Sequence, residues 1–178
     1  MNQKTIQTDV AIIGAGTAGL YALREVRRAN KQFVLIDKGP LGTTCARVGC
    51  MPSKLALHEG ALQKRQQNTE NKTNTFDADK LNKTWARLQE QRDFFANRAS
   101  KAAISAAKDQ LLTGNARFLT PTTLEVSNNG QITQVHAKKV IIANGSRPAI
   151  PAWLDPVLEH TISTDELFEL KELPSSIG

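Results

Sequence analysis

The sequence predicts an α/β fold, and three observations along the chain lead to this prediction. Residues 8–13 end in an apolar run that is typical of a buried parallel strand. The glycine turn GAGTAG follows at once, and a helical pattern then extends to about Ala29. A second apolar run, at residues 33–36, ends at Asp37. Strand, glycine turn, helix, strand and terminal acid in this order form the fingerprint of a Rossmann-like dinucleotide-binding unit.

Each glycine of the turn has a physical reason. Gly14 makes the tight turn, Gly16 lets the backbone approach a pyrophosphate, and Gly19 lets helix and strand pack closely. The following helix offers free N–H groups and the positive end of its dipole to phosphates. Asp37, 23 residues after Gly14, is placed to accept hydrogen bonds from a ribose. A glycine turn without a ligand is the alternative, but the flanking strands and the acid favour dinucleotide binding.

The two cysteines of the chain, Cys45 and Cys50, lie in the stretch GTTCARVGCMPSK at residues 42–54. On an ideal helix, five positions separate two Cα atoms by roughly 8 to 9 Å, whereas a disulfide needs them within about 7 Å. A bridge therefore needs a distorted turn, which Gly49 permits, and Pro52 can sit in the first turn of a following helix. A pair that bridges only with strain is a candidate for a labile, catalytic disulfide.

A helix-compatible stretch follows the cysteines, over about residues 50–64. Its apolar residues Leu55, Leu57 and Leu62 can face a core. Residues 65–75, RQQNTENKTNT, are polar and low in complexity, which indicates a solvent-exposed loop.

A longer helix is predicted over about residues 77–108, so that the two helices form a long pair. Arg92 interrupts a line of apolar residues with 4-3 spacing. The line consists of Leu81, Trp85, Leu88, Phe95, Ala99, Ala102 and Ala106. Such a seam could bind a partner helix, but packing on the helix's own domain explains the same spacing, and we favour that interpretation.

From Leu111 the period changes to short apolar runs, which predicts a small antiparallel β-meander with an Asn-Gly turn at residues 128–130. The apolar residues of these runs are Leu112, Ala116, Phe118, Leu124, Val126, Ile132 and Val135. A third apolar strand at residues 140–143 is expected to return to the parallel sheet. Ser163 can then cap a short helix that extends to about Leu170.

Composition bounds the classes of function. The 178 residues suffice for one domain, and 40% hydrophobic content with interspersed charge is typical of a soluble globular protein. The net charge of +6 is spread among acidic residues and aromatics are scarce, which argues against nucleic-acid binding. No apolar run approaches the roughly 20 residues of a membrane span, and the polar N-terminus has no signal-peptide core. We expect a cytoplasmic protein without a metal site, because the three histidines are scattered and two cysteines make a poor zinc site.

The chain resembles the first part of the flavin-dependent pyridine nucleotide–disulfide oxidoreductases. The redox stretch of that family reads close to GGTCxNxGCxPSK, and the glycine turn and the segment ANGSRP occur here in the family's order. The resemblance implies an FAD-binding domain over residues 1–150, with a connecting segment at 151–178 that leads to an absent NAD(P)-binding domain. The expected architecture is a truncated α/β fold, with a Rossmann-like parallel sheet, flanking helices, the meander and the long helix pair.

The resemblance also implies the site residues. Cys45 and Cys50 would form the redox disulfide, with Cys45 exchanging with substrate and Cys50 contacting the flavin. The glycine turn would hold the FAD pyrophosphate, Asp37 the adenosine ribose, and Ala116 the adenine through its backbone. The full set of implied cofactor-binding residues is Gly14, Gly16, Thr17, Ala18, Gly19, Asp37, Lys38, Gly42, Thr43, Thr44, Lys54, Ala116, Asn144, Gly145 and Ser146.

Three departures from the family pattern matter most. Thr43 stands at the family's second glycine, so we expect its backbone to avoid a conformation that only glycine adopts. Asn144 replaces the usual threonine, and Asp37 the usual glutamate. The ending PSK suits dihydrolipoyl dehydrogenase or mercuric reductase better than glutathione reductase.

For the intact relative, the resemblance implies oxidation of dihydrolipoamide to lipoamide with reduction of NAD, and a homodimer. The substrate would be a small dithiol or disulfide, or a lipoyl protein. Mercuric reductase, or another NAD(P)H-dependent disulfide reductase or transhydrogenase, is the alternative within the family. A non-enzymatic module that binds a nucleotide or a protein partner is the alternative outside it. We expect the chain alone to lack full turnover, because the nicotinamide site and the family's His–Glu pair are not matched in it.

Overall fold

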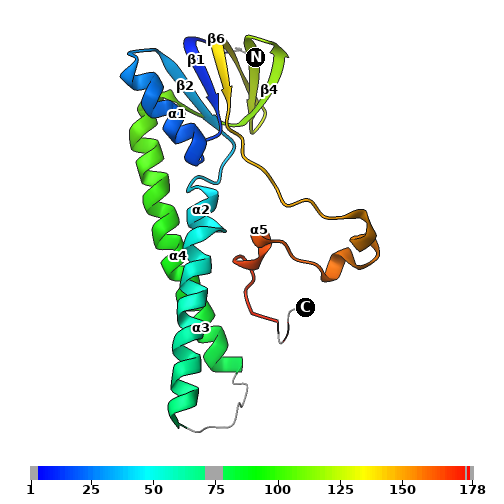
Figure 1. Ribbon diagram of the computed structural model, residues 1–178. Helices are drawn as coiled ribbons and strands as arrows, with labels where there is room; N and C mark the ends of the chain where they lie inside the picture. The colour runs from blue at the N-terminus through cyan, green and yellow to red at the C-terminus, as the bar shows by residue number, and fades with distance from the viewer. Residues whose placement is uncertain (1–3, 71–77, 175, 177–178) are drawn as a thin grey trace. The chain divides into compact units, whose positions relative to one another are not determined.

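The computed structural model describes residues 4–70, 78–174 and 176 (Figure 1). The elements are β1 (Lys4–Ile13), α1 (Thr17–Arg28), β2 (Phe33–Asp37), α2 (Thr44–Arg47), α3 (Cys50–Glu70), α4 (Ala78–Ala107), the 3-10 helix η1 (Lys108–Gln110), β3 (Leu111–Thr113), β4 (Asn115–Thr120), β5 (Thr123–Asn128), β6 (Gln131–Ile142), the 3-10 helix η2 (Ala152–His160) and α5 (Thr164–Leu167). The predicted α/β fold is confirmed.

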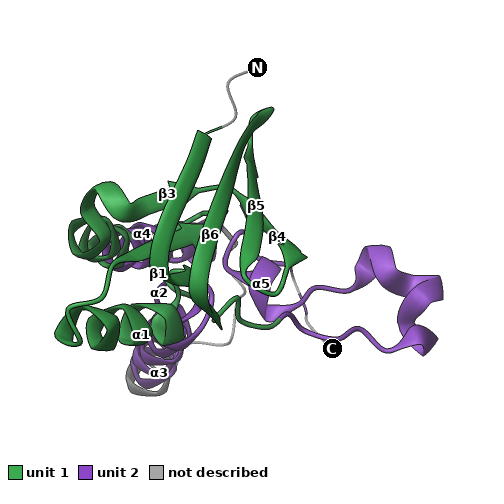
Figure 2. Cartoon of the chain, turned by 90° about the horizontal axis from the view of Figure 1, so that it is seen from above, with its two compact units in different colours: residues 1–43, 97–146 green, residues 44–96, 147–178 purple. Residues whose placement is uncertain are grey.

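The chain forms two compact units, coloured separately in Figure 2. Unit 1 comprises residues 1–43 and 97–146, and unit 2 comprises residues 44–96 and 147–178. This division differs from the domain limits expected from the sequence, 1–150 and 151–178, which stay a prediction.

Unit 1 is built on a six-stranded sheet in the order β3-β2-β1-β6-β5-β4. Strands β3, β2, β1 and β6 are parallel neighbours, whereas β5 and β4 continue the sheet antiparallel. Ile13 pairs with Ile36 on one side and with Ile142 on the other, and Asp37 pairs with Thr113. The four parallel strands therefore end at one edge of the sheet, where α/β proteins bind their ligands.

Apolar side chains fill both faces of this sheet because neighbouring residues of a strand point to opposite sides. On one face, Ile12 and Leu35 pack with Leu23 and Val26 of α1, which lies against the sheet in Figure 1, and with Ala107 at the end of α4. On the other face the packed cluster consists of Ala11, Val34, Ile36, Leu124, Val126, Val135 and Ala137. Each fully buried Ile or Leu contributes about 1.5 to 3 kcal/mol, so the sheet is the stable frame of unit 1.

The meander is part of the parallel sheet and not a separate one. The strand expected at residues 140–143 corresponds to the end of β6, which stops at Ile142. This strand of 12 residues pairs with β1 from Thr133 to Ile142. The first residues of the same strand pair antiparallel with β5 across the predicted Asn-Gly turn. Asn129 and Gly130 have φ of 47° and 80°, as a two-residue hairpin turn requires, so that prediction is confirmed.

Leu112 was expected in the meander, and this was wrong. It lies in β3, which pairs parallel with β2 at the opposite edge of the sheet from β4. Gly114, with φ of 152°, separates the two short strands β3 and β4. A run of alternating apolar residues does not identify the partner of an edge strand, because pairing is a contact between distant segments.

Unit 2 is built on helices, and its core is the cluster of Trp85, Leu88 and Phe168. The rings of Trp85 and Phe168 are stacked with centroids 5.8 Å apart, and Trp85 Nε1 donates to the carbonyl of Leu170 at 2.9 Å. Val48 and Leu55 pack against this cluster. In unit 2 the apolar line of α4 is therefore covered by its own unit, which confirms the favoured interpretation for Trp85 and Leu88.

Two expectations about α3 were wrong. Leu57 and Leu62 are 75% and 38% exposed, so they do not face a core, whereas Leu55 does. The helix extends to Glu70, so residues 65–70 are helical and not a loop, since Arg and Gln are good helix formers. The rest of the predicted loop, residues 71–75, lies outside the described residues.

The short helix near the end of the chain is confirmed as α5, although it ends at Leu167 and not at Leu170. The Ser163 side chain and the Glu166 carboxylate form a reciprocal capping box, with the Ser163 N–H donating to Glu166 Oε2 at 2.7 Å. Nothing in the sequence pattern predicted η2, whose nine residues follow Pro151.

Candidate cofactor and redox site

Two glycines of the turn after β1 are required by the chain itself. A Cβ atom on Gly14 would lie 2.2 Å from the carbonyl oxygen of Ala143, and the φ of Gly14 is 104°. A Cβ atom on Gly19 would lie 1.8 Å from the carbonyl oxygen of Gly14. The turn, the start of α1 and the end of β6 therefore touch through bare backbone, as the sequence predicted for close packing.

Gly16 differs from both. Its φ is −74°, which any residue adopts, and a Cβ atom there would meet nothing within 4 Å. No contact within the described chain therefore explains a glycine at this position. A ligand that approaches the backbone at Gly16 does explain it, and this is the role that the fingerprint predicts.

The N-terminus of α1 is open to an anion. Gly16 is the N-cap and provides no side-chain cap, and the first turn contains no acidic residue. Thr17 and Ala18 are exposed there, whereas Gly19 is buried. Uncapped N–H groups and the positive end of the helix dipole favour a phosphate at this position.

Asp37 lies at the end of β2, beside the same turn. Its Oδ2 atom accepts a hydrogen bond from the N–H of Ala15 at 2.6 Å, and its Oδ1 atom accepts one from the N–H of Gly39 at 2.6 Å. A carboxylate can accept roughly four hydrogen bonds. Asp37 thus ties the loop after β2 to the glycine turn and keeps acceptor capacity for ribose hydroxyls.

Other predicted residues of unit 1 lie on the strand ends around this turn. The N–H of Ala143 donates to the carbonyl of Ile13 at 2.8 Å, which places the exposed segment Asn144, Gly145 and Ser146 next to Gly14. The N–H of Gly114 donates to the carbonyl of Asp37 at 2.9 Å, two residues before Ala116. The structure thus gathers the predicted residues of the glycine turn, β2 and β6 at one sheet edge.

One expectation about the loop after β2, the backbone conformation of Thr43, was wrong. Thr43 has φ of 64°, so the threonine does not keep this backbone out of the left-handed region, as the sequence led us to expect. Its neighbour Gly42 has φ of 126°. Left-handed backbone is uncommon for a β-branched residue, so the loop holds Thr43 in a conformation that glycine would adopt more readily. Lys38, earlier in the loop, is exposed.

The two cysteines lie in unit 2, at adjoining helices. Cys45 is in α2, and Cys50 begins α3. The chain leaves the helical path at Val48 and Gly49, so the distorted turn that a bridge would need is present between the two cysteines. A Cβ atom on Gly49 would lie 3.0 Å from the carbonyl oxygen of Thr44, so glycine lets the two helix ends approach closely. The Ser53 Oγ–H then donates to the carbonyl of Gly49 at 2.7 Å.

Both cysteines are present as thiols, and they interact directly. A hydrogen bond with the Cys50 side chain raises the pKa of Cys45 above its ordinary value of 9.0, and desolvation raises it further. The nearby Lys54 charge acts in the opposite direction and lowers the pKa of Cys45. The two thiols therefore lie beside each other at the break between α2 and α3.

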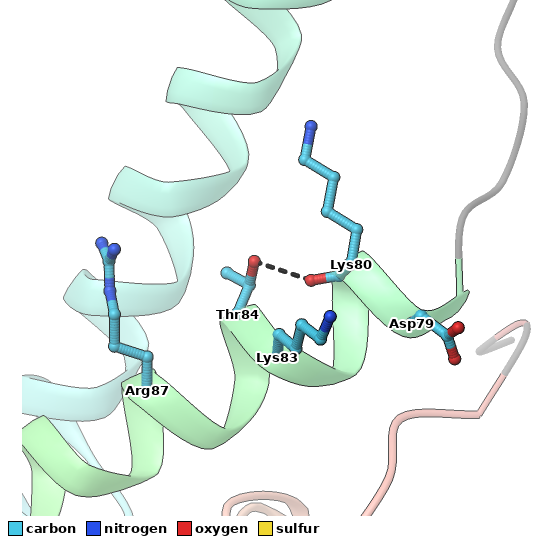
Figure 3. A pocket seen from close by; sticks show the side chains of 5 residues that line it. All are labelled: Asp79, Lys80, Lys83, Thr84 and Arg87. Carbon is cyan, nitrogen blue, oxygen red and sulfur yellow. Dashed lines mark hydrogen bonds between the residues drawn. The ribbon is translucent and has the colours of Figure 1, made fainter.

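A surface hollow elsewhere on α4 has no part in this site. Its lining residues among the described chain are Asp79, Lys80, Lys83, Thr84 and Arg87 (Figure 3). Thr84 donates to the carbonyl of Lys80 at 3.0 Å, and Arg87 pairs with Glu59 of α3 at 2.7 Å. All five belong to one helix, and the hollow contains none of the residues predicted to bind a cofactor.

No group of three or more His, Cys, Asp or Glu side chains among the described residues could hold a metal ion. None of the helices in the described ranges has the length and apolar character needed to cross a bilayer.

The chain matches known proteins along almost its whole length. The family Pyridine nucleotide-disulphide oxidoreductase matches residues 8–177. Glutathione reductase of Schizosaccharomyces pombe is 30% identical over 177 residues, which are 96% of this chain and 38% of the relative. Dihydrolipoyl dehydrogenase of Staphylococcus aureus is 30% identical over 97% of this chain and 37% of the relative. Mercuric reductase of Staphylococcus aureus is 30% identical over 96% of this chain and 31% of the relative.

A solved structure shares the fold. The Cu(II) complex of the HOCl-induced flavoprotein disulfide reductase RclA from Escherichia coli superimposes with a TM-score of 0.68, at 23% sequence identity. The superposition covers 98% of this chain and 36% of that one. The chain thus spans about a third of the length of these relatives. From the family match and the residues at its two sites, the chain belongs to the flavin-dependent pyridine nucleotide–disulphide oxidoreductases.

Proposed function

We propose that this chain is the FAD-binding, redox-disulfide part of a dihydrolipoyl dehydrogenase-like flavoprotein. The intact protein would oxidise dihydrolipoamide to lipoamide and reduce NAD, which binds to a separate domain. The observation that carries the proposal is the contact between the Cys45 and Cys50 thiols at the break between α2 and α3. The ending PSK of the redox stretch favours dihydrolipoyl dehydrogenase or mercuric reductase over glutathione reductase.

The proposed step at the cysteines is a thiol–disulfide exchange. A substrate thiolate attacks the Cys45 sulfur, the Cys45–Cys50 bond breaks, and Cys50 leaves as a thiolate. The second substrate thiolate then attacks the mixed disulfide at the substrate sulfur and releases Cys45, so lipoamide leaves and the protein holds two thiols. When bound, FAD supplies a two-electron acceptor that returns the pair to the disulfide and passes the electrons to NAD.

The residues proposed to hold the FAD pyrophosphate in the glycine turn of unit 1 lie where the parallel strands end. We assign the pyrophosphate to the turn of Gly14, Gly16 and Gly19 with the exposed N–H groups of Thr17 and Ala18. The support is that neither the backbone angle nor any contact within the described chain requires a glycine at position 16. The remaining assignments rest on the resemblance: Asp37 and Lys38 at the ribose, Ala116 at the adenine, Gly42, Thr43 and Thr44 at the pyrophosphate, Lys54 near the flavin, and Asn144, Gly145 and Ser146 over the cofactor.

A single-turnover experiment tests the proposed function. The oxidised chain is mixed with dihydrolipoamide, and protein thiols and lipoamide are counted after acid quenching and alkylation. We expect two new protein thiols, at Cys45 and Cys50, for each lipoamide formed. The Cys45→Ser variant, which cannot form the bridge, is the control. An oxidised chain that exchanges no faster than this control would contradict the proposal.

Substrate choice is tested in the same assay. Relatives named glutathione reductase, dihydrolipoyl dehydrogenase and mercuric reductase are equally similar at 30% identity. Glutathione and Hg(II) are therefore offered beside dihydrolipoamide, and we expect dihydrolipoamide to exchange fastest. Faster reaction of the reduced pair with Hg(II) would favour the mercuric reductase alternative.

The alternative outside the enzyme class is a module that binds a nucleotide or a protein partner. It predicts two freely titrating thiols and no flavin spectrum after incubation with FAD. We further propose that the intact protein is a homodimer, as the resemblance implies, which the molar mass in solution tests. A cytoplasmic location stays a prediction from the sequence.

A further inference from the structure

The short helix that carries Cys45 cannot hold its own shape. Helix α2 has four residues, Thr44–Arg47, and isolated helices shorter than about 12 residues are not stable in water. Its position therefore depends on contacts with the rest of unit 2. Ala46 is buried, and Val48, just after the helix, packs against the cluster of Trp85, Leu88 and Phe168.

A charged contact adds to these apolar ones. Arg47 Nη2, two residues after Cys45, donates to Glu169 Oε1 at 3.1 Å. The two residues are 122 positions apart in the sequence, so the pair joins α2 to the end of the chain. The side chains are 27% and 47% exposed, so solvent only partly screens the pair.

Glu169 is a fixed acceptor because its segment is fastened to α4. The carbonyl of Phe168 accepts hydrogen bonds from Arg92 Nη1 at 2.8 Å and from Gln89 Nε2 at 3.0 Å. The carbonyl of Leu170 accepts one from Gln89 Nε2 at 2.9 Å, beside the bond from the Trp85 indole. Both neighbours of Glu169 are therefore held by side chains of one helix.

Glu169 also forms an ion pair with a second arginine, Arg92. Arg92 is almost fully buried, and its Nη1 lies 3.2 Å from Glu169 Oε1, while its Nε lies 2.7 Å from Asp93 Oδ1. A buried guanidinium needs a fixed anion, so Arg92 keeps the Glu169 carboxylate in place whether or not Arg47 is bound to it. The Oε1 atom of Glu169 thus contacts both Arg47 of α2 and Arg92 of α4.

We propose that Arg47 and Glu169 position the turn that carries Cys45, and thereby set the redox potential of the Cys45–Cys50 pair. The proposal rests on the proposed function, since it concerns the same disulfide. The bridge matters most in the reduced state, where no covalent bond holds the thiols together. Releasing α2 lets the thiols separate, which stabilises the dithiol relative to the disulfide and makes the disulfide easier to reduce. The redox motif quoted above has asparagine where Arg47 stands, and this neutral, shorter side chain could not form the bridge.

The test uses the whole chain, equilibrated in buffers of reduced and oxidised glutathione. Thiols are trapped by acid and alkylation, and the reduced fraction is read by mass spectrometry. For Arg47→Asn we expect the equilibrium to move at least threefold towards the dithiol, which is about 15 mV at about 30 mV per factor of ten. Glu169→Gln, which also removes the anion beside Arg92, should shift the equilibrium in the same direction and at least as far. Arg47→Lys, which keeps the charge, should shift it less than Arg47→Asn.

Two controls separate positioning from general damage. Arg87→Asn breaks a comparable pair, Arg87 with Glu59 at 2.7 Å, in the same unit but away from α2, and should leave the potential at the wild-type value. The double variant Arg47→Asn/Glu169→Gln should shift no further than Glu169→Gln alone, because that change already removes the carboxylate that Arg47 contacts. If Arg47→Asn does not fold, Glu169→Gln and Arg47→Lys carry the same comparison.

The outcomes separate the two proposals. A reversible Cys45–Cys50 disulfide whose potential does not change in Arg47→Asn and Glu169→Gln would overturn the positioning role and leave the proposed function standing. Shifts that add in the double variant would overturn the positioning role too, because the two side chains would then act independently. A wild-type chain that forms no reversible disulfide would overturn the proposed function, and the positioning role with it.

Discussion

The two units place their functional residues by different means. In unit 1 the glycine turn is set by backbone contacts, with Gly14 and Gly19 where any Cβ atom would collide with a carbonyl oxygen. In unit 2 the cysteines sit at helix ends that are held by side chains, among them Val48, Arg47 and the stacked rings of the core. Backbone contacts tolerate no change in size, whereas side-chain contacts can be loosened one at a time. Substitutions at the glycine turn of unit 1 should therefore destabilise its fold, whereas loosening single side-chain contacts around the cysteines of unit 2 should change their chemistry by degrees.

The largest effect is expected from the core of unit 2. Trp85→Ala removes a buried ring, its stack on Phe168 and its hydrogen bond to the Leu170 carbonyl. Such truncations cost about 3 to 5 kcal/mol. Chemical denaturation monitored by circular dichroism measures the loss. A cost below about 1 kcal/mol would show that this cluster does not hold the segment that carries Glu169.

The next effect is expected at the close contact in unit 1. Gly19→Ala would place a Cβ atom 1.8 Å from the carbonyl oxygen of Gly14. Overpacking of this kind costs about 3 kcal/mol. The matched control is Gly60→Ala in α3, where a Cβ atom meets nothing and the change should stabilise by up to about 1 kcal/mol. Equal denaturation midpoints for the two variants would contradict the role of bare backbone in the turn.

A substitution at Gly16 should lower FAD affinity and leave the stability of the fold almost unchanged. Gly16→Ala has room for its Cβ atom and an ordinary φ, so we expect the free energy of unfolding to change by less than about 1 kcal/mol. The added methyl group would stand where the pyrophosphate approaches, and FAD affinity should fall about tenfold, which is about 1.4 kcal/mol. Fluorescence titration with FAD measures this. Unchanged affinity would remove the main structural support for the FAD site.

The smallest effect concerns protonation in unit 2. Cys50→Ala removes the side chain whose hydrogen bond is the largest cause of the raised pKa of Cys45, so that pKa should fall towards its ordinary value. The alkylation rate of Cys45 by iodoacetamide, measured against pH, should then rise at lower pH than in the reduced wild type. A midpoint that stays or moves to higher pH would contradict the contact between the thiols.

The same shift has a consequence for stability. Because the pKa of Cys45 is raised in the folded chain, its contribution to the free energy of unfolding is present below the pKa of the unfolded thiol. That contribution declines as the pH rises through the higher pKa of the folded chain. Reduced wild type should therefore lose stability as the pH rises above the ordinary thiol pKa of 9.0, and Cys50→Ala should lose less.

Much of the fold could be predicted because it is encoded in local patterns. The apolar runs before Gly14 and Asp37, the helix between them and the Asn129-Gly130 turn depend on neighbouring residues, and each was found at its predicted place. The break between Cys45 and Cys50 also follows from local geometry, since five helical positions separate the thiols too far. The family match adds agreement over residues 8–177.

The errors occurred where a local pattern leaves the partner open. Leu57 and Leu62 have the periodicity of a core-facing helix but lie exposed, and Leu112 has the alternation of a meander but pairs with β2. An apolar residue is buried only if another segment covers it, and the covering segment can lie anywhere in the chain. Thr43 shows the same limit for backbone, because the surrounding loop imposes a conformation that its side chain disfavours.

The sequence by itself determined the Rossmann-like frame, the glycine turn and the cysteine pair, because spacing and backbone sterics act over a few residues. Only the tertiary structure shows which contacts require glycine, since Cβ atoms on Gly14 and Gly19 would collide with the carbonyls of Ala143 and Gly14, whereas one on Gly16 would meet nothing within 4 Å. It also brought Glu169 to Arg47 across 122 positions. Such pairings depend on how the chain folds back on itself, and the local periodicity of the sequence does not predict this.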